Sequence, residues 1–146
     1  MEELNLDFVK KETMYLFTKA RKSPQCKLKY ILTSMGSHGI LLARIDQASG
    51  KIVFDHFKAA KVERIEDVNG AGRNFMKGGI TYPLGDSFVG GLVWALSKGK
   101  AIKEAIKAGQ ICSGLTLASK DNISPEITEE KVLKELENSS NKNKSK

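Results

Sequence analysis

The sequence predicts an α/β fold in which strands and helices form layers. Apolar residues recur at helical spacing in several segments, short apolar runs are typical of strands, and glycines stand where strands end. A chain of 146 residues is long enough for one domain with a core and too short for two ordinary ones. We therefore expect one domain over residues 1–137, followed by a disordered basic tail over residues 138–146.

The first part of the chain predicts a helix followed by strands. Apolar residues at roughly helical spacing favour a helix over residues 6–22, which Ser23 and Pro24 would end. In the turn MGSHG, Gly36 and Gly39 are free to take positive φ. The strands on either side of the turn MGSHG, and of the hairpin turn QASG, are expected to be LKYILTS (28–34), ILLARI (40–45) and KIVFDHF (51–57). Another short strand is expected over residues 59–67.

The segment DSFVGGLVWALSKG predicts a helix. Phe88, Leu92 and Leu96 would share one face of it, and Gly99 is a suitable residue to end it.

Two more helices are expected after it. The helix over residues 101–119 includes small residues that would allow close packing against a neighbour. In the last helix, Ser124 would be the N-cap and Pro125 the first helical residue. The buried stripe of the helix over 101–119 would consist of Ile102, Ile106, Gly109 and Cys112.

Composition excludes several classes of protein. Cys26 and Cys112 lie in no Cys/His cluster, so we expect no structural zinc and a reducing, cytoplasmic location. The formal charge is +7, but no aromatic residues are interleaved with the basic ones, so we do not expect nucleic-acid binding. No apolar run is long enough to span a membrane. His38 and His56 are expected in a turn and on an exposed strand position, without a chemical role.

Two glycine clusters, NGAG and GDSFVGG, each resemble half of a phosphate-binding turn. Glycines ahead of a helix let an anion approach the unpaired backbone N–H groups. Asp86 at this place has two interpretations. It is either the N-cap of the helix or a base that takes a proton from a hydroxyl attacking the phosphate.

Joining Asp67–Gly72 directly to Asp86–Leu92 gives DVNGAGDSFVGGL. This resembles the C-terminal signature of the ribokinase-like (PfkB) carbohydrate kinases. LTSMGSHGILL and GKAIKEAIKAGQICSGLTL are similar to segments that flank this signature in the family, and SKDNISPEI looks most like eukaryotic pseudouridine kinases. The resemblance implies the C-terminal half of a ribokinase-like, Rossmann-like layered fold.

The resemblance also implies ligands and roles. It implies ATP and Mg²⁺ as cofactors, a monovalent cation such as K⁺, and a small-molecule sugar or nucleoside as acceptor, with a homodimer as an assembly of the complete enzyme. Asp86 would be the catalytic base. The anion hole would be formed by Gly70, Ala71, Gly72 and Gly85, and the ATP site would include Thr33, Gly36, Gly39 and Gln110. The monovalent cation would bind near Asp67. For Gln110, an ordinary place on a helix surface is an equal alternative.

The sequence departs from the family in two ways. Family members are about twice as long, and their N-terminal half contacts the sugar. Residues 73–85 interrupt the signature without a change of reading frame, which suggests either an alternative splice junction or an error in the gene model. We therefore expect a kinase whose chain alone is inactive. The alternative is a truncated or splice-variant fragment that acts, if at all, by association.

Overall fold

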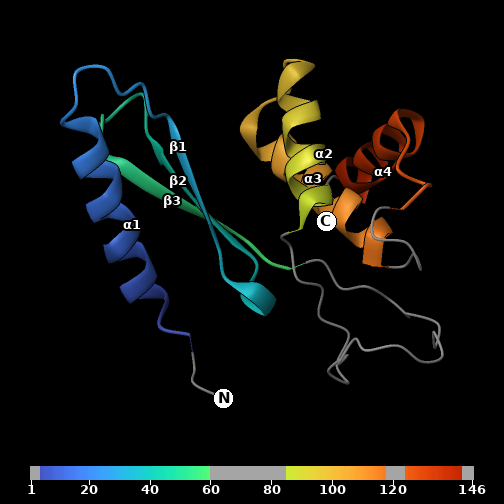
Figure 1. Cartoon of the computed structure of the whole chain (residues 1–146), viewed down its shortest axis with the longest axis horizontal. Coiled ribbons are helices and arrows are strands. Elements are labelled where there is room, and N and C mark those ends of the chain that lie inside the picture. The colour runs from blue at the N-terminus through green and yellow to red at the C-terminus, as the bar shows by residue number, and fades with distance from the viewer. Residues whose placement is uncertain (1–3, 60–84, 118–123, 143–146) are drawn as a thin grey trace. The chain divides into compact units, whose positions relative to one another are not determined.

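The computed structural model describes residues 4–59, 85–117 and 124–142 (Figure 1). The chain divides into a sheet unit, residues 1–58, and a helical unit, residues 59–146. The strand predicted over 59–67 falls on residues of which all but the first lie outside the described ranges. The single domain predicted over residues 1–137 stays a prediction.

The sheet unit begins with helix α1, Leu6–Arg21, which confirms the predicted helix. Asn5 is its N-cap, because the side-chain oxygen accepts a hydrogen bond from the backbone N–H of Phe8 at 3.0 Å. The helix ends just before Ser23, as predicted. Thr13 and Phe17 are its buried residues, one turn apart on one face.

In the described residues, three antiparallel strands form a sheet in the order β1-β2-β3, and the two connections are the predicted turns. The strands are β1 (Tyr30–Ser34), β2 (Ile40–Ile45) and β3 (Ile52–Phe57). Thr33 pairs with Leu41, which in turn pairs with His56, so these three side chains share one face.

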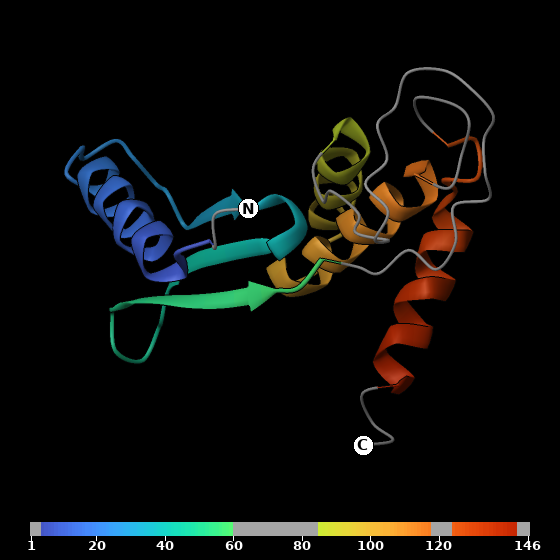
Figure 2. The same ribbon diagram turned by 90° about the horizontal axis from the view of Figure 1, so that it is seen from below.

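Helix α1 packs against β1 on the face of the sheet that carries Thr33 (Figure 1, Figure 2). The hydroxyl of Thr33 lies 3.1 Å from that of buried Thr13. Leu41 and Ala43 of the central strand are fully buried on the same face, and Phe17 of α1 is fully buried as well. This apolar layer fixes the sheet relative to α1.

The helical unit contains α2 (Asp86–Ser97), α3 (Ile102–Leu117) and α4 (Glu129–Lys142). Helix α3 lies between the other two (Figure 2). Gly99 ends α2 as predicted, with φ of 75°. Its N–H donates to Leu96, and the N–H of Lys100 donates to Ala95, which is the Schellman pattern.

Helices α2 and α3 meet at glycines. A Cβ added to Gly91 would stand 2.7 Å from the sulfur of Cys112, and one added to Gly109 would stand 2.7 Å from the carbonyl oxygen of Phe88. This confirms the predicted close packing of α3 through small residues. The predicted face of α2 is partly wrong, because Leu96 is exposed and the buried side is built from Phe88, Gly91 and Ala95.

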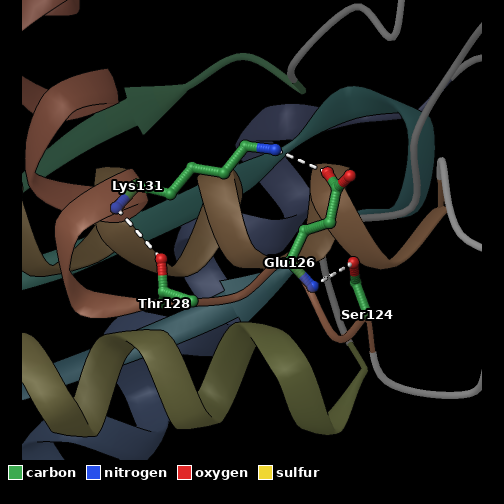
Figure 3. Close-up of polar contacts among 4 residues, drawn as sticks. All are labelled: Ser124, Glu126, Thr128 and Lys131. Atoms are coloured by element: carbon green, nitrogen blue, oxygen red, sulfur yellow. Dashed lines mark hydrogen bonds and ion pairs between the residues drawn. The ribbon is translucent and has the colours of Figure 1, made fainter.

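The start of α4 differs from the prediction (Figure 3). Thr128, not Ser124, caps the helix, since its hydroxyl accepts a hydrogen bond from the N–H of Lys131 at 3.2 Å. Ser124 instead closes a turn by accepting from the N–H of Glu126 at 3.2 Å, and Glu126 pairs with Lys131. The helix continues through Lys142, so residues 138–142 are helical where disorder was predicted.

The mixed α/β class is confirmed, because a sheet and helices are both present. Both strand pairings in the described residues are antiparallel, so the described sheet is not the parallel sheet of a Rossmann-like fold. The ribokinase-like arrangement therefore stays a prediction. Within the described ranges, no helix is both long and apolar enough to cross a membrane.

Candidate active site

The start of α2 is the centre of the candidate site. Gly85 is the N-cap, with extended backbone at φ of −138°, and its carbonyl oxygen accepts from the N–H of Phe88 at 3.0 Å. Asp86 is the first helical residue, and it is exposed. The N-cap interpretation of Asp86 is therefore wrong, because Gly85 is the N-cap and Asp86 lies within the first turn of the helix.

This geometry suits an anion. The N–H groups of the first two helical residues, Asp86 and Ser87, have no acceptor within the helix, and the helix dipole makes this end partly positive. A Cβ built on Gly85 would have no neighbour within 4 Å among the described atoms beyond its own chain neighbours, so no other described side chain covers the backbone on that side. A phosphate oxygen could reach these N–H groups, with the Asp86 carboxylate beside it.

Two contacts on α3 hold the first turn of α2. The hydroxyl of Ser87 lies 2.7 Å from that of Thr116, and the ring of buried Phe88 lies against Gly109. Sequence reasoning did not find Ser87 or Thr116, because the two residues are 29 positions apart and share no motif.

Gly36 and Gly39 lie in the turn between β1 and β2, a short 3-10 helix called η1 (Gly36–His38). Both have positive φ, 55° and 91°, which confirms the conformation predicted for them. The N–H of Met35 donates to the carbonyl of Gly39 at 2.8 Å and closes the turn. From β3, His56 Nε2 lies 2.6 Å from the carbonyl oxygen of His38 and ties the turn to the sheet.

The remaining predicted ATP residues lie on regular elements. Thr33 is on β1 and directs its hydroxyl to Thr13 of α1. Gln110 is half-buried on α3. The structure thus brings Gly36 and Gly39 into one turn of the sheet unit.

In the helical unit, the structure joins Gly85 and Asp86 at one helix start. The other predicted site residues, Asp67, Gly70, Ala71 and Gly72, lie outside the described residues.

The pKa shifts described below arise from adjacent side chains or from burial. In the sheet, the hydrogen bond from Arg44 to Asp55, 2.8 Å long, raises the pKa of the guanidinium. In the turn after β2, the Ser49 hydroxyl donates to Asp46 and lowers the pKa of that carboxyl. Between α2 and α3, burial raises the pKa of the Cys112 thiol. The part of the chain that the structure describes holds no group of three or more His, Cys, Asp or Glu side chains that could bind a metal ion.

No protein-family model matches the chain. Among solved structures, the chain is similar to a putative sugar kinase from Clostridium perfringens, with a TM-score of 0.60 and 22% sequence identity. The likeness covers 94% of this chain and 35% of the clostridial chain. The fold matches part of a sugar-kinase fold. This chain therefore spans about a third of the length of its structural neighbour.

Proposed function

We propose that this chain supplies the nucleotide-binding part of an ATP-dependent phosphotransferase of the ribokinase-like (PfkB) class. The acceptor is the hydroxyl of a sugar or a nucleoside, and the proposed nucleoside is pseudouridine. The observation that carries the proposal is the start of α2, where Gly85, which no other described side chain covers, precedes an exposed Asp86 at the positive end of a helix. The likeness to part of a sugar-kinase fold supports it.

In this proposal the backbone N–H groups at the start of α2 bind the phosphates of ATP, together with the anion hole of Gly70, Ala71 and Gly72. The carboxylate of Asp86 takes the proton of the attacking hydroxyl. The new bond joins the acceptor oxygen to the γ-phosphorus, the bond from that phosphorus to the leaving oxygen breaks, and ADP departs. Positioning and charge stabilisation account for most of the catalysis in such transfers.

Magnesium enters this scheme as part of the substrate, Mg-ATP. The described residues offer no cluster of metal ligands, so no step is assigned to a protein-bound ion. A monovalent cation at Asp67 remains part of the proposal, and that residue lies outside the described ranges.

The turn η1 fits the role of a second nucleotide contact. Its two glycines have positive φ, which a residue with a side chain rarely adopts, and His56 holds the turn in place. By the family resemblance, we propose nucleotide contacts for Thr33, Gly36 and Gly39 in the sheet unit, and one for Gln110 in the helical unit.

Equilibrium titration of the chain with Mg-ATP and Mg-ADP tests the proposal. A nucleotide-binding chain gains thermal stability with ligand concentration, by about 2.7 kcal/mol at a hundred times the dissociation constant. Mg-GTP serves as a control for base selectivity, and tripolyphosphate serves as a control for simple charge attraction to a basic protein. The absence of a stabilising effect of ATP, or an effect equal to that of tripolyphosphate, would refute a nucleotide site.

A further inference from the structure

The hydroxyls of Ser87 and Thr116 form a junction beside the candidate base. Ser87 follows Asp86 directly, in the first turn of α2, and its hydroxyl lies 2.7 Å from that of Thr116 near the end of α3. The Thr116 hydroxyl also accepts a longer hydrogen bond, 3.4 Å, from the N–H of Ser124. One side chain therefore joins α2, α3 and the segment that leads to α4.

The junction adds a polar contact to the apolar packing between α2 and α3. Phe88 is buried against Gly109 and Gly91 lies against Cys112, so the axis of α2 is held close to α3 along this side. Helix ends fray unless contacts hold the first turn. Phe88 supplies an apolar contact there, and the bond from Ser87 to Thr116 supplies a polar one at the residue next to Asp86. Both hydroxyl side chains are half-buried, so water competes with this bond less than at an exposed site.

We propose that Ser87 and Thr116 are positioning residues for the phosphate-binding end of α2. They fix the direction of the first N–H groups and of the Asp86 carboxylate, while touching neither nucleotide nor acceptor. This inference rests on the proposed function, because the two residues can position a phosphate-binding turn only if phosphate binds at the start of α2. It predicts that loss of the junction weakens binding of the phosphates and spares binding of the nucleoside.

The test compares variants of the whole chain for binding of ATP and of adenosine by equilibrium titration. Thr116→Val keeps the size of the side chain and removes the hydroxyl, and Ser87→Ala removes the other partner. We expect each to weaken ATP binding about threefold to tenfold, the range that one hydrogen bond is worth, with adenosine binding unchanged. Thr116→Ser keeps the hydroxyl and should retain ATP affinity. The double variant should lose no more than either single one.

Thr128→Val is the matched control. It removes a hydroxyl that caps α4 and lowers stability without touching α2, so it should leave ATP affinity unchanged. Melting temperatures show whether each variant is folded, and if Thr116→Val does not fold, Ser87→Ala carries the test. Unchanged ATP affinity in the folded variants, or a parallel loss of ATP and adenosine binding, overturns the positioning role alone. Failure of the unsubstituted chain to bind ATP overturns the proposed function and this inference together.

Discussion

Gly109 of α3 lies so close to Phe88 of α2 that an added Cβ would stand 2.7 Å from the Phe88 carbonyl oxygen and 2.8 Å from its ring. No real side chain tolerates such contacts, and the backbone oxygen has no freedom to move away alone. The two helices are therefore held together at a distance that a methyl group would increase.

Gly109→Ala should lower the free energy of unfolding by about 1 to 3 kcal/mol, the usual cost of overpacking a buried contact. Gly90→Ala is the matched control on α2, because a Cβ there would have no neighbour within 4 Å among the described atoms. Alanine is the better helix former, so this control should be neutral or up to about 1 kcal/mol more stable. Denaturant unfolding measures both, and equal changes would contradict the close contact.

Asp86→Asn tests the chemistry of the candidate base. Because the charge beside the phosphate site is removed, ATP affinity should stay the same or rise slightly, and the loss of a favourable helix-dipole contact should lower the melting temperature only slightly. In a chimera that adds the two thirds of the kinase fold this chain does not match and omits residues 73–85, turnover should fall by a factor of about 10² to 10⁴. Unchanged turnover in that chimera would remove Asp86 from the mechanism.

His56→Ala should loosen the turn that holds Gly36 and Gly39. The variant loses the hydrogen bond between His56 Nε2 and the carbonyl of His38, worth about 0.5 to 1.5 kcal/mol, and the exposure of His56 places the cost at the lower end. Hydrogen exchange of the amides of residues 38 and 39 should become faster. His38→Ala is the control, because the contact uses its backbone oxygen. A similar increase in exchange in the control would show that the ring of His56 does not hold the turn.

Cys112 should resist alkylation in the folded chain, while Cys26 reacts. Cys112 is buried between α2 and α3, and Cys26 is half-buried in the segment after α1. Mass spectrometry after timed treatment with iodoacetamide measures both rates in one sample. Equal rates for the two thiols under native conditions would contradict the burial of Cys112.

The pH dependence of stability gives a second measurement on the same thiol. Burial raises the pKa of Cys112 in the folded state, so the folded chain keeps the proton that the unfolded chain releases. The contribution to stability is complete below the ordinary thiol pKa of about 8.5 and declines as pH rises above it. Cys112→Ala should remove that part of the decline, and a decline of the same size in the variant would assign it to other groups.

Local signals made most elements predictable. The helix α1 is marked by the spacing of its own apolar residues. The turn η1 and the end of α2 are each marked by glycines that take positive φ. Each of these signals lies within the element that it predicts. The cap of α4 was not predictable in the same way. Ser124 and Thr128 both precede helix-forming residues, and only the turn made by Ser124 with Glu126 decides that Thr128 begins the helix.

Contacts between distant residues set the limit of prediction at the candidate site. The sequence motif predicted Gly85 and Asp86, and the structure places them at a helix start. The pairs that support the site and its turn, Ser87 with Thr116 and His56 with His38, depend on which elements pack together. The exposure of Leu96 has the same origin, because the glycine contacts with α3 select a different face of α2.

The sheet unit has a consequence for how the chain forms its structure during synthesis. Each described strand pairs with the next strand in sequence through a short turn, so neither of these two pairings has to wait for a distant part of the chain. Hairpins of this kind form in about 1 to 10 μs, and proteins rich in local contacts fold fast. A ribosome adds about 5 to 20 residues per second. Once both of its strands have left the ribosome, each hairpin therefore forms faster than the next residue can be added to the chain.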